Sequence, residues 1–237
     1  MWRSKSPLPM SSAEIRAMLP KAGGAELLDD GVYSLIIKNR WYAAKPELRW
    51  LRKKVRPYLT EKRARHVAGC EEQAVKLARR WGADVYEAAE AGILHDITKK
   101  LSDEEQLIMC DKYGIILDAA ERRNPRILHA RTGAALAREL FGIPDGIYSA
   151  IRWHTTGKPD MSLMEKIIYL ADFTEPTRDF EGVEPLRKLC FEDIDRAMEL
   201  GLRMSLEEIR SRGEDAYKDT VDAYQWYKKE QGGSATC

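Results

Sequence analysis

The chain contains only four histidines, and together with two aspartates they could bind metal ions. His95 directly precedes Asp96, and because neighbours on a helix diverge by about 100°, both side chains can reach one cavity. Asp172 lies in the apolar sequence YLADF, where burial of an unpaired carboxylate is costly. A bound cation would remove that cost. The candidate ligands are His66, His95, Asp96, His129, His154 and Asp172.

The size and chemistry of this set indicate two ions rather than one. A structural zinc prefers a closed shell of four ligands, whereas six ligands suit a pair. Imidazoles and carboxylates without thiolates suit iron, manganese or zinc, and Asp96 has two oxygens with which it could bridge both ions. Paired ions about 3.5–4 Å apart can bind a phosphoryl group and activate water. A single histidine in a helix is more often an ordinary polar residue, so the prediction depends on the whole set.

The spacing of apolar residues predicts helices along most of the chain. They recur every three or four residues, and sustained alternation typical of strands is rare. One helix is expected between Thr60 and Gly82, and Asp84 begins another that continues through Asp96. Further helices are expected after Ser102, Pro125, Pro144 and Ser162, from about 191 to 212, and from about 219. Helices joined by short connections predict an all-α bundle.

The composition narrows the class of protein. The 237 residues include 39 basic and 38 acidic side chains, so a net charge of +1 provides no strong attraction to nucleic acid or membrane. The four cysteines are scattered without a C-x-x-C pair, which indicates reduced thiols. Because no signal peptide or long apolar run is found, we expect a cytoplasmic protein. Phosphate-binding glycine motifs of the P-loop and dinucleotide type are also absent from the sequence.

Five segments of the chain resemble the YqeK branch of the HD-domain phosphohydrolases, which are symmetrical diadenosine tetraphosphate hydrolases. The segments are RARHVAGC (63–70), AAEAGILHDITKKLS (88–102), ILHARTGAALA (127–137), AIRWHTTGKPDMSLMEKIIYLADFTEPTRDFEGVEPLR (150–187) and DTVDAYQWY (219–227). The resemblance implies an HD-domain helical bundle over residues 60–230, followed by a flexible tail at 231–237.

The resemblance also implies an activity, in which a dimetal-activated hydroxide cleaves diadenosine tetraphosphate into two ADP. One iron would be bound by His66, His95, Asp96 and Asp172, and the other by Asp96, His129 and His154, with manganese compatible. Asp96 and Lys99 are expected to be catalytic. The expected substrate-binding residues are Arg63, Asp96, Ile97, Thr98, Lys99, His129, His154, Thr155, Asp172 and Arg178. Thr220 would border the base or ribose, whereas Gln225 stands where the family more often has asparagine.

Other functions stay open at this point. The chain could act on another nucleotide, or could be a non-catalytic nucleotide-binding HD module or a plain helical interaction module. Lys100 and Lys158 fit solvated surface as well as phosphate binding. The expected partner is a small nucleotide, with neither nucleic acid nor membrane, and a homodimer is left open.

Residues 1–59 differ from the rest and form a predicted helical appendage. The sequence from Met10 to Arg16, followed by DDGVYSLIIKNRWY, resembles the C-terminal end of nicotinate-mononucleotide adenylyltransferase. Its motif I-S-S-T-x-I-R has Ala13 here in place of threonine. That enzyme also needs an H-x-G-H motif, and no histidine precedes His66, so we predict no adenylyltransferase activity. The segment is interpreted as a fusion remnant or as the product of a gene model that starts too late; the alternative is an unrelated short helical hairpin.

Overall fold

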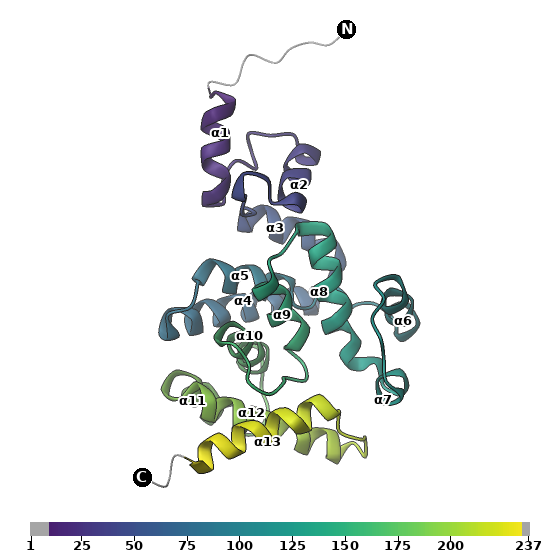
Figure 1. Cartoon of the computed structure of the whole chain (residues 1–237). Coiled ribbons are helices and arrows are strands. Elements are labelled where there is room, and N and C mark those ends of the chain that lie inside the picture. Colours follow the sequence, from purple (N-terminus) through teal and green to yellow (C-terminus); the bar gives the residue numbers. More distant parts are fainter. Residues whose placement is uncertain (1–9, 234–237) are drawn as a thin grey trace.

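The structure is a computed structural model that describes residues 10–233. Every regular element in that range is a helix (Figure 1), which confirms the all-α prediction. The α-helices are α1 (Ser12–Met18), α2 (Asp30–Asn39), α3 (Leu48–Val55), α4 (Glu61–Trp81), α5 (Val85–Leu94), α6 (Asp103–Lys112), α7 (Ala119–Arg123), α8 (Leu128–Phe141), α9 (Asp145–Trp153), α10 (Leu163–Thr174), α11 (Val183–Glu192), α12 (Ile194–Ser211) and α13 (Lys218–Gly233). Short 3-10 helices occur at η1 (Leu19–Lys21), η2 (Trp41–Ala43), η3 (Arg56–Tyr58) and η4 (Pro125–Ile127).

The helices that carry the candidate ligands begin and end at local sequence signals. Thr60 accepts a hydrogen bond from the Arg63 amide at the start of α4, and Gly82 ends that helix at a positive φ of 74°. Ser102 and Ser162 form the expected capping boxes at the starts of α6 and α10. Each cap satisfies amide groups that have no partner within their helix, so these boundaries could be predicted from the sequence.

Several helices differ from the sequence prediction in where they end or in whether they were expected at all. α5 ends at Leu94, so His95 is its C-cap and Asp96 lies in the following turn rather than inside the helix. The stretch expected from about 191 to 212 corresponds to α12, which begins at Ile194 because Asp193 leaves the helical conformation at φ −152° and caps α12 with its side chain, and the preceding α11 was not predicted. The short helices α3 and α7 were not predicted, since eight and five residues carry little periodicity.

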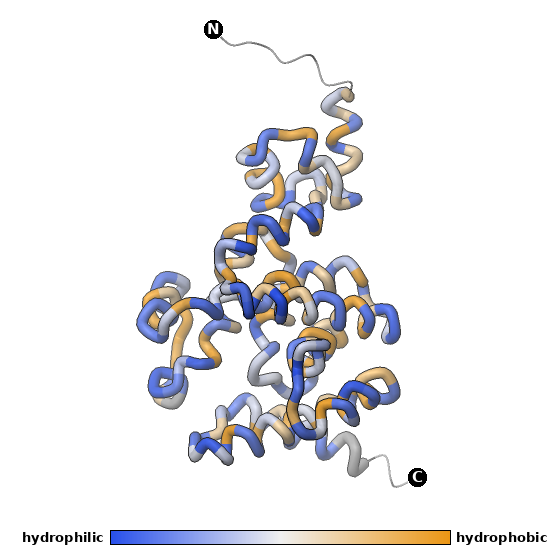
Figure 2. Tube along the Cα trace, turned by 180° about the vertical axis from the view of Figure 1, so that it is seen from behind, coloured by the Kyte–Doolittle hydropathy of each residue, from blue (hydrophilic) through white to orange (hydrophobic). Residues whose placement is uncertain are grey.

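The core lies between α4, α5, α8, α9 and α10, with α11, α12 and α13 packed along one side (Figure 1). Hydrophilic and hydrophobic residues alternate along these helices (Figure 2), as expected for amphipathic helices around one core. α4 and α5 cross closely at Gly92, where a Cβ atom would lie 2.8 Å from the Cα atom of Glu71. This close crossing brings the end of α5 next to the middle of α4.

The N-terminal helices share the core of the larger part. Tyr33, Ile37 and Leu51 are fully buried in the same apolar cluster as the helices α4 to α10. Arg40 donates hydrogen bonds to the Phe141 and Gly142 carbonyls, both at 3.0 Å, and pairs with the buried Glu90. α1 is the exception, since none of its residues is buried among the described residues. No helix within residues 10–233 is long and apolar enough to cross a membrane.

Candidate metal centre

All six candidate ligands come together at one place in the bundle. His66 comes from the middle of α4, His95 from the C-cap of α5, Asp96 from the turn that follows, and His129 from the start of α8. The other two are His154, the C-cap of α9, and Asp172, near the end of α10. The four imidazoles and Asp96 are buried, and Asp172 is partly buried.

Asp96 lies between two pairs of imidazoles. Its Oδ2 is 3.5 Å from His66 Nε2 and 3.4 Å from His95 Nε2. Its Oδ1 is 3.3 Å from His129 Nε2 and 3.8 Å from His154 Nε2. Each carboxylate oxygen therefore faces its own imidazole pair, which is the arrangement required of a residue that bridges two ions.

Asp172 completes the first of these groups. Its Oδ1 lies 2.9 Å from His66 Nε2 and 3.8 Å from His95 Nε2. Two groups have ligand atoms that all lie within 4.8 Å of one another: His66, His95 and Asp96, and Asp96, His129 and His154. Asp96 belongs to both, as the sequence predicted.

The backbone and one carboxylate orient every imidazole in the same way. His95 Nδ1 lies 2.8 Å from the Gly92 carbonyl oxygen. His129 Nδ1 lies 2.7 Å from that of Arg126, and His154 Nδ1 lies 2.6 Å from that of Ile151. In His66, Nδ1 lies 3.0 Å from Glu175 Oε1. Since these oxygens can only accept, Nδ1 carries the proton in each ring and Nε2 presents a lone pair to the centre.

This arrangement of lone pairs fits a bound cation. His66 Nε2 and His95 Nε2 lie 3.2 Å apart, and with both lone pairs facing inward neither can donate to the other. His154 Nε2 is buried and has no hydrogen-bond partner among the described residues. An unsatisfied buried acceptor costs free energy, which a metal ion would recover. The donor set of imidazoles and carboxylates suits a divalent ion of the iron, manganese or zinc class.

The electrostatics of the centre keep most of the candidate ligands in the forms that bind metals. His95 is the exception, because burial acts to lower its pKa but the nearby Cys70 and Asp96 outweigh burial and raise it well above its ordinary value. Burial lowers the pKa of His154 to about 4. Burial and the nearby Lys99 ammonium hold the pKa of His129 well below its ordinary value. Burial alone would raise the pKa of Asp96, but the neighbouring His95, His129 and Arg63 outweigh it and hold that pKa well below its ordinary range. At neutral pH the His129 and His154 imidazoles are therefore neutral and Asp96 is ionised.

Three basic side chains surround the centre. Arg63 Nη1 is 2.7 Å from Asp96 Oδ2, and Arg178 Nη2 is 2.7 Å from Asp172 Oδ1. Lys99 Nζ is 3.4 Å from His129 Nε2, and burial lowers the pKa of its ammonium group. These cations place positive charge directly beside the carboxylates and imidazoles of the centre.

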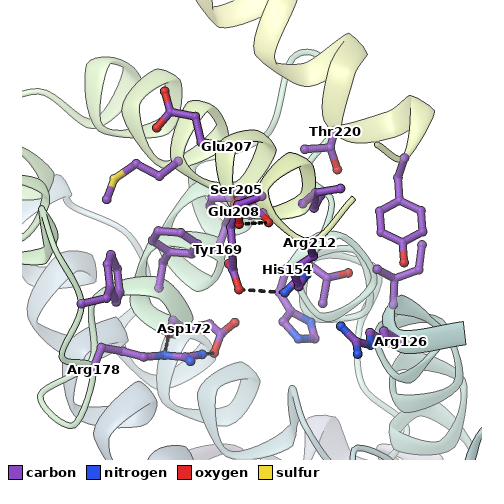
Figure 3. A pocket seen from close by; sticks show the side chains of 18 of the residues that line it. Arg126, His154, Tyr169, Asp172, Arg178, Ser205, Glu207, Glu208, Arg212 and Thr220 are labelled. Carbon is purple, nitrogen blue, oxygen red and sulfur yellow. Dashed lines mark hydrogen bonds and ion pairs between the residues drawn. The ribbon is translucent and has the colours of Figure 1, made fainter. Parts of the chain in front are cut away.

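A cavity of about 780 Å³ opens beside the centre, and that is large enough for a nucleotide. Lys99, His129, His154, Thr155, Asp172 and Arg178 line its base. In Figure 3, Asp172, Arg178 and His154 lie on the side opposite the α12 residues Ser205 and Glu208. Thr220, at the start of α13, also lines the cavity.

Some expected substrate contacts lie elsewhere. The side chain of Ile97 is buried in the apolar core, and the Thr98 hydroxyl donates to the His129 carbonyl at 2.9 Å, so neither lines the cavity. Lys158 pairs with Glu165 at 3.2 Å, and Gln225 is exposed. Thr98 helps to position His129, and a nucleotide could meet Ile97 or Thr98 only through the backbone.

Other residues of the site were missed from the sequence. Glu175 is fully buried behind His66, and its only sequence signal was its place in the EPTR segment after α10. Burial by itself raises a carboxyl pKa, but hydrogen bonds from Thr177 and His66 outweigh it and lower the pKa of Glu175. Arg126 and Arg212 also line the cavity, and no sequence pattern distinguished them from surface arginines.

Comparisons with known proteins agree with this geometry. The family model described as "HD domain" matches residues 63–177. A Bacillus subtilis (strain 168) protein named "Bis(5'-nucleosyl)-tetraphosphatase, symmetrical" is 38% identical over 73% of this chain and 92% of its own length. A Clostridium acetobutylicum crystal structure described as a "predicted HD superfamily hydrolase involved in NAD metabolism" is 35% identical, with a TM-score of 0.74 over 76% of this chain and 96% of that one.

A further match extends into the N-terminal appendage. A Mycoplasma genitalium protein named "Probable nicotinate-nucleotide adenylyltransferase/Ap4A hydrolase" is 27% identical over 85% of this chain and 55% of its own length. Because residues 60–237 make up about three quarters of the chain, a match over 85% includes part of residues 1–59. By the extent and identity of the matches to the Bacillus subtilis protein and the Clostridium acetobutylicum structure, the chain belongs to the HD-domain family that includes the symmetrical bis(5'-nucleosyl)-tetraphosphatases.

Proposed function

We propose that this protein hydrolyses diadenosine tetraphosphate symmetrically into two ADP. The observation that carries the proposal is the position of Asp96, which lies between two pairs of imidazoles, one of which (His129 and His154) lines a nucleotide-sized cavity. The relative from Bacillus subtilis, named for this activity, matches this chain over 92% of its own length. The described residues supply both the metal ligands and the cationic surroundings that a polyphosphate needs.

The proposed metal ligands are the six predicted from the sequence. One divalent ion would be held by His66, His95, Asp96 and Asp172, and a second by Asp96, His129 and His154. Iron is the proposed ion, and manganese fits the same donors. When bound, such a pair supplies Lewis-acid chemistry and lowers the pKa of bound water, which provides a nucleophile at neutral pH.

The protein's own side chains would bind and orient the polyphosphate. Lys99, Arg63 and Arg178 surround the carboxylates of the centre and can turn their hydrogen bonds toward phosphate oxygens, for which charge-assisted bonds are strongest. Thr155 lines the cavity beside His154 and can donate its hydroxyl. Asp96 and Lys99 are the proposed catalytic residues, since they lie closest to where the scissile phosphate would sit against both imidazole pairs.

Product analysis tests this proposal. Purified protein loaded with iron or manganese is incubated with diadenosine tetraphosphate, and the nucleotides are separated by chromatography. We expect ADP as the sole product, and none after metal removal. ATP together with AMP would contradict symmetrical cleavage. Preferred turnover of another nucleotide in a substrate panel would favour the alternative HD-type activity, and tight nucleotide binding without turnover would favour a non-catalytic module.

We further propose that residues 60–230 form the hydrolase domain and that residues 1–59 derive from a two-enzyme ancestor. The match to the Mycoplasma genitalium protein supports this, because it includes part of the N-terminal appendage. Sequencing the 5′ end of the transcript separates the two versions of the proposal. A transcript that begins at Met1 favours a fusion remnant, whereas upstream coding sequence with an H-x-G-H motif would show that the gene model starts too late.

A further inference from the structure

His66 differs from the other three histidines in the group that accepts its Nδ1 proton. His95, His129 and His154 each donate to a backbone carbonyl three residues earlier, at or beside a helix end. His66 lies in the middle of α4, where the preceding carbonyls already accept the hydrogen bonds of the helix. Its Nδ1 donates instead to Glu175, which is a charged acceptor rather than a neutral one.

Glu175 is held firmly in that position. Its side chain is fully buried, the Thr177 amide donates to Oε2 at 2.7 Å, and the Thr177 hydroxyl donates to Oε1. Gly69 on α4 makes room for it, since a Cβ atom there would collide with Glu175 Oε2. The carboxylate therefore cannot move into solvent, and its charge stays next to the His66 ring.

The two groups of ligands consequently differ in charge. We call the position between His66, His95, Asp96 and Asp172 the deep position, and the position between Asp96, His129 and His154 the cavity position. The deep position has two carboxylate ligands and Glu175 behind it. The cavity position has a share of Asp96 alone, and Lys99 Nζ lies 3.4 Å from His129 Nε2, the atom that must bind the ion.

Two arginines act against this difference, but only in part. Arg63 and Arg178 each lie 2.7 Å from an oxygen of Asp96 or Asp172. Their side chains are 29% and 37% exposed, so water screens them, whereas Glu175 has no exposure. Arg63 pairs with Asp96, the carboxylate shared by both positions, so it weakens metal binding at both of them.

Access to solvent differs in the same direction. Of the four imidazoles, His129 and His154 line the cavity, whereas His66 and His95 do not; Asp172 is the one ligand of the deep position that also lines it. We propose that the two positions bind divalent ions with unequal affinity, and that Glu175 is the positioning residue that makes the deep position the tighter one. This inference rests on the ligand set of the proposed function.

Metal binding without substrate tests the inference. The full chain is stripped of metal and titrated with Mn²⁺ by calorimetry, with elemental analysis after dialysis. We expect two classes of site in the wild type, one ion each. Glu175→Gln, which keeps the size and removes the charge, should weaken the tight class about 10- to 100-fold and leave the weak class unchanged. His129→Ala should remove the weak class alone.

The control is Glu165→Gln, which makes the same change at another buried carboxylate of α10, where the partners are Ser149 and Lys158. It should bind both ions as the wild type does. Thr177→Val tests the same contact if Glu175→Gln does not fold, and should weaken the tight class by a smaller factor. Equal affinities in the wild type, or an unchanged tight class in either variant, would overturn the inference. A wild type that binds no ion would contradict the proposed ligand set itself.

Discussion

Two buried carboxylates in this protein have opposite surroundings. Glu90, on α5, is 1% exposed and already pairs with Arg40 from the N-terminal appendage. Asp96, a few residues further along, is 2% exposed and is surrounded mainly by imidazole nitrogens that present lone pairs. Burial of a charge therefore does not by itself identify a functional site. What distinguishes the metal centre is a group of inward-facing acceptors that only a cation can satisfy.

The largest effect should follow from substitution at the centre. Asp96→Asn replaces an oxygen that faces one imidazole pair with an amide, so the shared ligand is lost. Because metal catalysis supplies several kcal/mol, turnover of diadenosine tetraphosphate should fall about 10³-fold or more. Thermal unfolding of the metal-free protein should show an intact fold. Turnover near that of the wild type would show that Asp96 does not serve as the bridge.

Substitution of Arg40, which attaches the N-terminal appendage to the bundle, should lower stability and leave turnover unchanged. Arg40→Ala leaves Glu90 buried without its partner and removes the hydrogen bonds to the Phe141 and Gly142 carbonyls. Removing one partner of a buried pair costs about 3–5 kcal/mol, and we expect the lower end because Arg40 is 22% exposed. The free energy of unfolding, measured in urea, should fall accordingly, with kcat of the folded enzyme unchanged. A fall in kcat without loss of stability would show that the Arg40 contacts affect the metal centre.

The pH dependence of that variant sharpens the comparison. Burial raises the pKa of Glu90 even with Arg40 present, and removal of Arg40 should raise it further. A raised carboxyl pKa means that the folded state binds the proton more tightly than the unfolded state. Stability should therefore fall as the pH rises through the folded pKa, and the deficit of Arg40→Ala relative to wild type should shrink as the pH is lowered toward 5. A deficit that is constant between pH 5 and 8 would show that Glu90 does not take up the proton.

The smallest effect is expected at a third buried carboxylate. Glu165 has its own partners in Lys158, at 3.2 Å, and Ser149. Lys158 is 28% exposed and does not line the cavity, so its pair with Glu165 should be worth about 1 kcal/mol or less. Lys158→Ala should leave KM for diadenosine tetraphosphate within about twofold of the wild type. A large increase in KM would mean that this lysine reaches the substrate after all.

More of the centre than of its surroundings could be predicted from the residues alone. The helix caps at Thr60, Ser102 and Ser162 act locally, and each could be predicted from residues three positions apart. The end of α5 was placed too late, because His95 still has helical φ and ψ and neither glycine nor proline follows Leu94 to mark the change. α12 was predicted to within three residues, whereas the preceding α11 was missed, and only Asp193 divides the two helices.

The six candidate ligands and the all-helical class could be predicted from the sequence, because the scarcity of histidine and an apolar period of three to four residues are both properties of the chain itself. The middle position of Asp96, the burial of Glu175 against His66 and the attachment of the N-terminal helices through Arg40 were decided by the tertiary structure. Glu175 lies 109 residues from His66, and Arg40 lies 101 residues from Phe141. Contacts over such separations depend on how helices cross, as at Gly92, and no local pattern records them.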